Sequence, residues 1–226
     1  MNDYLDVIVL VEGQTESIFV KNILAPYLGR KNIGMTPIVV SKPGQNGGDI
    51  RFDRVRNDIE KHLKQRSDTY LTLLIDFYGI KRWPDYDAAK MQETAWQKAR
   101  AFLESTKYHL INELPDLNVQ QRFIPYVSMH EFEALLFSDV DILSQSLGIS
   151  AENVEAVLTE CGSAENINDT PETIPSRRIE HLNSHFKKTS SGIAIAEKIG
   201  IEAMRKACPI FNDWLIRIES LSPFSG

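Results

Sequence analysis

The sequence contains few cysteines and no long apolar segment. Its 226 residues include only two cysteines, Cys161 and Cys208, which lie far apart and outside any Cys-x-x-Cys spacing. This argues against a disulfide framework and against a thiolate zinc site. No apolar run is long enough to span a bilayer, and the N-terminus lacks the basic and apolar regions of a secretory signal. We therefore expect a cytoplasmic protein that does not associate with membranes.

Common catalytic motifs and an excess of basic residues are also missing. No Gly-x-Ser-x-Gly sequence and no Cys-His pairing supports acyl transfer, and no Gly-Lys-Ser/Thr completes a Walker A motif. The net charge is −6 and the pI is about 5.4. These values argue against a constitutive basic nucleic-acid binder, whose affinity comes from neutralising phosphates. They do not argue against a metal enzyme, because bound cations restore the attraction to phosphate.

Apolar runs alternate with helical patterns in the first half of the chain. The pattern predicts four strands, at residues 5–11, 36–40, 70–75 and 122–127. Helices are predicted between them, at residues 15–28, 52–66 and 86–114, the last of which could be two helices. This alternation is typical of right-handed crossovers and a mostly parallel sheet. Beyond residue 129 only short helices are predicted, so we expect an α/β core at 1–128 and a helical region at 129–226 packed on it.

Three acidic residues follow predicted strands. Glu12 comes directly after the first strand, and Asp76 ends the buried run at residues 71–75. If both strands are central and parallel, the two carboxylates meet at the carboxyl edge of the sheet, where open α/β sheets bind ligands. Glu16 lies one helical turn after Glu12, and Thr15 is the expected N-cap. Carboxylate oxygens suit Mg²⁺ or Mn²⁺, although Glu16 could equally stabilise the helix start and Asp76 could begin a turn.

A second group of candidates follows the fourth strand. Glu131 begins a predicted helix and would project toward the same edge, whereas Glu133 points elsewhere if that helix begins early. Only one of the two is therefore expected to bind a metal directly. His130 could be a metal ligand, a general base or a phosphate partner, but a lone histidine is more often structural.

Basic residues supply candidate phosphate contacts. Lys42 lies in the glycine-rich segment 41–48, which either exposes backbone N–H groups to an anion or is a plain loop. Arg177 and Arg178 stand at a predicted helix start, and a guanidinium matches the geometry of phosphate. The alternative for this arginine pair is a solvated helix end or an ion pair with nearby acidic residues.

These motifs resemble those of a known fold. The segments Val11-Glu12-Gly13-Gln14-Thr15-Glu16 and Ile75-Asp76-Phe77-Tyr78-Gly79 resemble the Toprim domain of topoisomerases, primases and overcoming-lysogenization-defect nucleases. Nearly the whole chain is similar to a bacterial Toprim-like family of unassigned function. That similarity includes the segments 122–126, 130–139, 167–169, 175–178 and 208–211. Members of that family are often encoded beside an ABC- or AAA-type ATPase, which implies an anti-phage or mobile-element setting.

The resemblance implies a Rossmann-like fold and a divalent metal held by carboxylates. Glu12 matches the glutamate after the first strand, Asp76 the first Asp of an Asp-x-Asp, and Glu16 the second acidic residue of the nuclease-type first motif. Tyr78 replaces the second Asp, which removes one ligand; by position alone, Glu131 or Glu133 could supply it.

We therefore predict a Mg²⁺- or Mn²⁺-dependent nuclease acting on DNA or RNA, in which Glu12, Asp76 and Glu131 are catalytic. Two alternatives are a non-catalytic subunit of an ATPase complex, favoured by Tyr78, and phosphoryl or nucleotidyl transfer to a small nucleotide. The sequence leaves the oligomeric state open.

Overall fold

The computed structural model describes residues 4–40, 50–80, 82–167 and 173–223. The described residues fall into two compact units. The first, which we call the sheet unit, combines Met1–Val127 with Trp214–Gly226, and the second, the helical unit, is Ser128–Asp213. Residues 214–223, which the sequence pattern grouped with the helical region, thus belong with the sheet. We describe each unit by itself.

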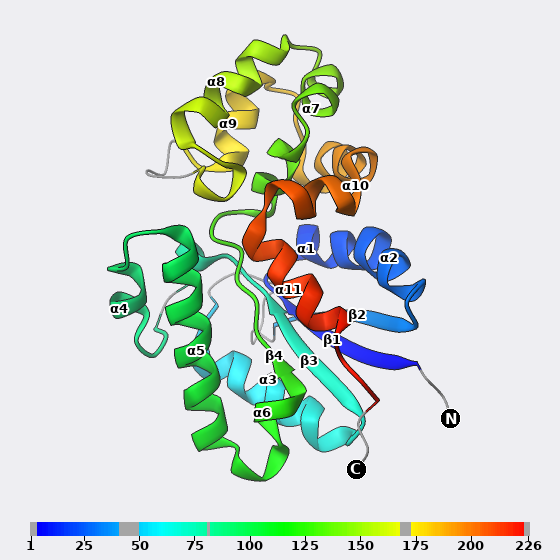
Figure 1. Cartoon of the computed structure of the whole chain (residues 1–226), viewed down its shortest axis with the longest axis vertical. Coiled ribbons are helices and arrows are strands. Elements are labelled where there is room, and N and C mark those ends of the chain that lie inside the picture. Colours follow the sequence, from blue (N-terminus) through cyan, green and yellow to red (C-terminus); the bar gives the residue numbers. More distant parts are fainter. Residues whose placement is uncertain (1–3, 41–49, 81, 168–172, 224–226) are drawn as a thin grey trace. The chain divides into compact units, whose positions relative to one another are not determined.

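A four-stranded parallel sheet forms the centre of the sheet unit (Figure 1). Its strands are β1 (Leu5–Val11), β2 (Ile33–Val39), β3 (Thr69–Leu74) and β4 (Phe123–Ile124). They are arranged in the order β2-β1-β3-β4, and Val11 at the end of β1 is in register with Val39 and Leu74. The predicted α/β fold with a parallel sheet is confirmed.

Proline residues limit the two outer strands. β4 is much shorter than the predicted strand at 122–127, because Pro125 has no N–H to donate to a neighbouring strand. Pro37 lies within β2 opposite Val9, and it is tolerated there because β2 is an edge strand.

Helices connect the strands. The predicted helix at 15–28 is continuous from residue 14 to residue 29, with a π-helical turn just before Pro26, whose missing N–H prevents a regular α-helical bond. Its N-cap is Gly13 and not Thr15, which is buried inside the first turn. The predicted segment 86–114 is two helices. The bounds are α1 Gln14–Phe19, η1 Val20–Leu24, α2 Ala25–Gly29, α3 Phe52–Gln65, η2 Phe77–Gly79, α4 Tyr86–Lys90, α5 Ala95–Glu113, η3 Pro115–Leu117 and α6 Val119–Arg122.

The last turns of the final helix, α11 (Pro209–Glu219), also pack in the sheet unit. The indole of Trp214 donates a hydrogen bond of 2.8 Å to Thr72 Oγ1 of β3 and stacks on Tyr126 with ring centroids 4.4 Å apart. The buried Thr72 hydroxyl in turn donates to the carbonyl of Ile124. A polar group buried in a central strand is thus fully paired, which avoids the cost of an unmade hydrogen bond.

Short helices make up the helical unit. Their bounds are η4 Phe132–Ser138, α7 Val140–Leu147, α8 Ala151–Cys161, η5 Ala164–Asn166, α9 Pro175–Leu182, η6 Lys188–Gly192 and α10 Ile193–Ala207, followed by the start of α11. The helix predicted to begin at Glu131 is a 3₁₀-helix that starts one residue later, and α10 is interrupted by Gly200, whose φ is 74°. Helix α9 ends at Leu182, and Cys208 separates α10 from α11.

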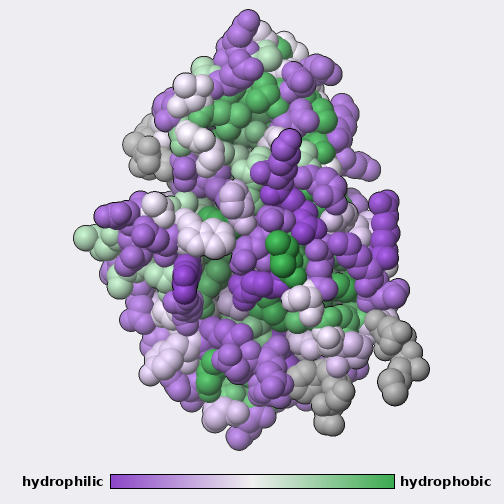
Figure 2. All heavy atoms as spheres, viewed as in Figure 1, coloured by the Kyte–Doolittle hydropathy of each residue, from purple (hydrophilic) through white to green (hydrophobic). Residues whose placement is uncertain are grey.

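Hydrophilic residues dominate the face shown in Figure 2, and the hydrophobic ones form separate patches. Among the described residues, no helix is both long and apolar enough to cross a membrane.

The buried Arg122 holds the end of α3 and the start of β3 together. Its guanidinium donates to the carbonyls of Leu63 (3.1 Å) and Thr69 (3.0 and 3.1 Å), and also to that of Arg66. These carbonyls include the last, otherwise unsatisfied, groups of a helix. Arg122 thus satisfies backbone groups that the helix and the strand cannot pair themselves.

We expect Arg122→Met to lower the free energy of unfolding by about 2–4 kcal/mol, because it leaves buried carbonyls without donors. Urea denaturation followed by circular dichroism measures the change. Arg100→Met is the matched control, since Arg100 is exposed and pairs with Glu104 on the helix surface, and should change stability by less than about 0.5 kcal/mol. Equal effects of the two substitutions would contradict this role for Arg122.

Glu165 caps the start of α11. Its two carboxylate oxygens accept hydrogen bonds of 3.0 Å from the backbone N–H groups of Ile210 and Phe211. Burial nevertheless dominates and raises the pKa of Glu165 from 4.5 to about 7. Between these two pH values the folded state therefore binds more protons than the unfolded state, so the contribution of Glu165 to stability falls as the pH rises.

We expect Glu165→Gln, which imitates the protonated carboxyl, to remove this pH dependence. The variant should gain stability relative to the wild type between pH 5 and pH 8, by about 1–3 kcal/mol. Denaturation curves at the two pH values provide the measurement, with the exposed Glu155→Gln as the control for loss of charge in the same unit. If the free energy of unfolding changed with pH in the same way for the wild type and Glu165→Gln, the pKa of Glu165 would not be raised by folding.

Candidate active site

Glu12 and Asp76 lie side by side at the carboxyl edge of the sheet. Each follows a central strand, and these strands, β1 and β3, are hydrogen-bonded neighbours. A Cβ atom placed on Gly79 would lie 3.5 and 3.7 Å from the carboxylate oxygens of Glu12 and 3.7 Å from Cβ of Asp76. Both side chains thus border the same glycine, and the Oε2 atom of Glu12 is inaccessible to solvent. The predicted meeting of Glu12 and Asp76 at one edge is confirmed.

The strand order places this pair where connections diverge. The connection from β1 leads to β2 on one side of the acidic pair, and the connection from β3 leads to β4 on the other side (Figure 1). Right-handed crossovers in opposite directions run over opposite faces of the sheet. The ends of β1 and β3 therefore form the topological switch point, which is the usual ligand site of open α/β sheets.

Glu16 performs a local structural task in the same segment. Its Oε2 atom accepts a hydrogen bond of 3.0 Å from the backbone N–H of Gly13. This contact satisfies a donor at the start of α1 and places a negative charge at the positive end of the helix dipole. The helix-stabilising alternative for Glu16 is thus present in the structure, while its predicted support of a metal stays a prediction.

The donor set at this edge suits a magnesium-type ion with few protein ligands. Among the residues that the structure describes, no group of three or more His, Cys, Asp or Glu side chains is arranged to hold a metal. Mg²⁺, however, usually keeps several waters and is held by one or two carboxylates together with substrate phosphates. Glu12 and Asp76 provide two hard oxygen donors of this kind, so these residues fit Mg²⁺ or Mn²⁺.

Tyr78 stands where the Toprim resemblance implies a second aspartate. This residue is 38% exposed and packs edge-on against Phe77, with the ring centroids 5.2 Å apart. The Tyr78 hydroxyl oxygen lies 3.4 Å from Lys98 Nζ. A neutral phenol is a poorer ligand for a hard cation than a carboxylate. The site therefore has fewer anionic ligands than the Toprim motif implies.

Glu131 and Glu133 belong to the helical unit, where both contact Lys188. Glu131 accepts hydrogen bonds from Lys188 Nζ (2.6 Å) and from the backbone N–H of Ser176 (2.9 Å), at the start of α9. Lys188 Nζ also lies 3.6 Å from the buried carboxylate of Glu133. Although burial opposes it, these hydrogen bonds hold the pKa of Glu131 below its usual value. Glu131 thus acts as a helix cap and ion-pair partner within its own unit.

The described residues that were predicted to contact phosphate are buried or engaged in ion pairs. His130 is buried, with 5% of its surface exposed. Arg178 forms a bidentate ion pair with Glu160 at 2.7 and 3.0 Å, and Arg177 pairs with Glu180 at 2.8 Å. The ion-pair alternative for the two arginines is what the structure contains. Lys42 lies outside the described residues.

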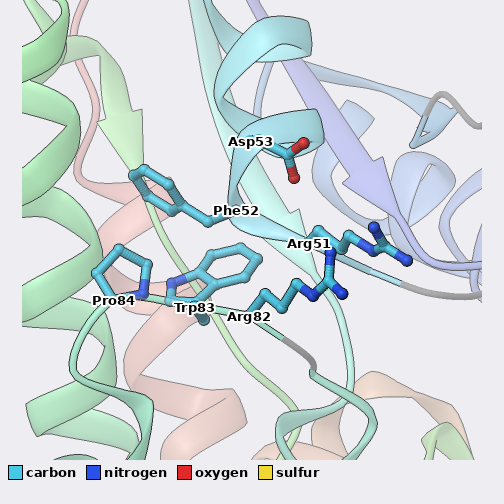
Figure 3. A pocket seen from close by; sticks show the side chains of 6 residues that line it. All are labelled: Arg51, Phe52, Asp53, Arg82, Trp83 and Pro84. Carbon is cyan, nitrogen blue, oxygen red and sulfur yellow. The ribbon is translucent and has the colours of Figure 1, made fainter.

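The structure contains a cationic pocket that the sequence analysis missed. Arg51, Phe52 and Asp53 at the start of α3 and Arg82, Trp83 and Pro84 after β3 line a cavity of about 410 Å³ (Figure 3). Its two halves are joined by a hydrogen bond of 3.4 Å from Phe52 N–H to the carbonyl of Arg82. These residues form no recognised motif, so the sequence indicated only that three of them lie at the start of a predicted helix.

A known protein family matches most of the chain. A family model described as a domain of unknown function (DUF4276) matches residues 11–219. No curated protein and no solved structure matches the chain. This match confirms the predicted similarity of nearly the whole chain to a family without assigned function, whereas the Toprim relationship and the link to an ATPase stay predictions.

We expect Glu131→Gln to destabilise the protein by about 1–3 kcal/mol at pH 7, because it breaks the ion pair with Lys188. A lowered pKa stabilises the fold above the unfolded value of 4.5 and loses this effect as the pH falls through the folded value. The difference from wild type should therefore shrink below pH 4.5. Denaturation at pH 7 and pH 4 tests this, with the more exposed Glu180→Gln as control. Unchanged stability combined with weaker Mn²⁺ binding would instead support Glu131 as a metal ligand.

Proposed function

The chain belongs to the family described as a domain of unknown function (DUF4276), and we propose that it is a metal-dependent phosphodiesterase acting on nucleic acid. The observation that carries this proposal is the pairing of Glu12 and Asp76 at the topological switch point, bordering Gly79. Two carboxylates converging at this position of an α/β sheet favour a cation-assisted reaction at phosphate.

Glu12 and Asp76 are the residues that would hold the cation. When bound, Mg²⁺ or Mn²⁺ polarises a phosphoryl oxygen and lowers the pKa of an attacking water. The carboxylate of Glu12 is fixed by its place at the end of a buried strand, with one oxygen shielded from solvent. Asp76 is fixed in the same way by β3. Because both are anchored by neighbouring strands, their separation is set by the sheet and not by a flexible loop.

The resemblance to Toprim nucleases supports a nucleic-acid substrate, and it extends the proposal to cooperation with an ATPase in an anti-phage setting. The net charge of −6 is compatible with such a substrate, since a bound cation compensates the local acidity.

A second candidate is a non-catalytic subunit that keeps the fold. Tyr78 favours it, because a phenol replaces a ligand that nucleases of this type use. The two candidates differ in whether phosphodiester bonds are cut, and both are compatible with binding of one cation.

We expect the wild type to cleave plasmid DNA or RNA in the presence of Mn²⁺, and Glu12→Gln and Asp76→Asn to reduce the rate about a hundredfold or more. The exposed Asp116→Asn is a matched control in the same unit and should cleave normally. Calorimetric titration with Mn²⁺ accompanies each variant.

Activity that survives both substitutions would refute the proposed site. Mn²⁺ binding that depends on Glu12 and Asp76, without cleavage of either substrate by the wild type, would favour the non-catalytic subunit.

A further inference from the structure

Two arginines from separate parts of the chain line the pocket at the start of α3. Arg51 is the N-cap residue of α3, and Arg82 lies in the segment that follows β3. Figure 3 shows both guanidinium groups on the same side of the pocket, with Phe52 and Pro84 on the other side. Such planar, permanently charged groups bind phosphate oxygens through paired hydrogen bonds.

The start of α3 adds to this positive region. The backbone at Arg51 is extended, and the Arg51 side chain itself does not cap the helix. The N-terminal N–H groups of a helix favour anions. Asp53 also lines the pocket, but its carboxylate lies apart from the two guanidinium groups in Figure 3. The balance of charge among the lining residues is positive.

Apolar side chains form the remaining wall. Phe52 and Trp83 pack edge to face with centroids 5.4 Å apart, and the Trp83 indole donates to Thr106 Oγ1 at 2.8 Å. Both rings are therefore held rigidly. A cavity of about 410 Å³ has the size of a small-molecule site. Phosphate with an attached sugar or base matches this combination of cations and apolar surface better than an inorganic anion does.

The pocket is close to the acidic pair along the chain. Gly79 borders both Glu12 and Asp76, and Arg82 follows it by three residues. Three Cα-to-Cα steps span at most about 11 Å. Arg82 is thus within reach of a ligand group near the acidic pair.

We propose that this arginine pocket binds a phosphate of a nucleotide unit next to the one held at Glu12 and Asp76. The inference rests on the proposed function for the identity of the ligand and assigns the substrate a second contact point. A polynucleotide strand is the ligand that places consecutive phosphates at both positions. Arg51 and Arg82 are therefore substrate-binding residues, and the acidic pair is separate from them.

The test measures binding without cleavage. Fluorescence anisotropy of a labelled single-stranded oligodeoxynucleotide, in EDTA, compares the wild type with Arg51→Gln, Arg82→Gln and Arg82→Lys. We expect each glutamine variant to weaken binding about tenfold and to reduce the slope of log affinity against log salt by about one. Arg82→Lys should lose less. The exposed Arg100→Gln is the control for loss of one positive charge, and thermal denaturation confirms that each variant folds.

Competition with a nucleoside monophosphate separates the two sources of phosphate. Weak competition supports a polynucleotide strand, whereas competition as strong as that of the unlabelled oligonucleotide overturns the strand assignment in favour of a free nucleotide. Wild-type affinity and salt slope in Arg82→Gln, or no binding by the wild type, overturn the pocket. If the arginine variants bind more weakly, and the wild type binds the oligonucleotide in EDTA but cleaves no nucleic acid, the pocket stands and only the nuclease is refuted. Loss of cleavage in Glu12→Gln with unchanged binding in Arg82→Gln would support the nuclease and refute the pocket.

Discussion

The candidate site depends on the parallel pairing of β1 with β3. Register along this pair places Val11 opposite Leu74, so that the residues that follow the two strands emerge together. Both strands are almost entirely buried, and a shift by one residue would move every side chain to the opposite face of the sheet and disrupt the packing on both faces. The positions of Glu12 and Asp76 are therefore fixed by hydrophobic packing and backbone hydrogen bonds and require no direct attraction between the two carboxylates, which repel each other as charges. Such a pair is a natural place for a cation.

Several acidic residues, including the predicted site residues Glu16 and Glu131, serve backbone groups in the structure. Glu16 accepts from Gly13 N–H, Glu131 from Ser176 N–H, and Glu165 from the first turns of α11. Each satisfies donors that a helix start leaves unpaired. Short helices need many such caps per residue, so a carboxylate at a helix start does not by itself imply chemistry. Arg122 performs the corresponding task for carbonyl groups in the sheet unit.

The fold was more predictable than the site. Apolar runs at 5–11 and 70–75 identified the central strands because burial on both faces leaves a continuous hydrophobic sequence. The extent of β4 was overestimated, because Pro125 ends the pairing that the apolar run suggested. The N-cap was placed at Thr15, because threonine is a common cap; the conformation of Gly13 and the reach of Glu16 decided otherwise. Arg178 was considered for phosphate, but its partner Glu160 is 18 residues away, a separation that local sequence patterns do not reveal.

The sequence by itself determined the two central strands, most of the helices, and the presence of an acidic residue at the end of each central strand. These follow from periodicity and burial, which are local properties of the chain. Only the tertiary structure decided that β1 and β3 are neighbours, that Arg51 and Arg82 share one pocket, and that Glu131 is engaged by Lys188. The reason is that such contacts depend on crossover connections and on packing between distant segments, which no local pattern encodes.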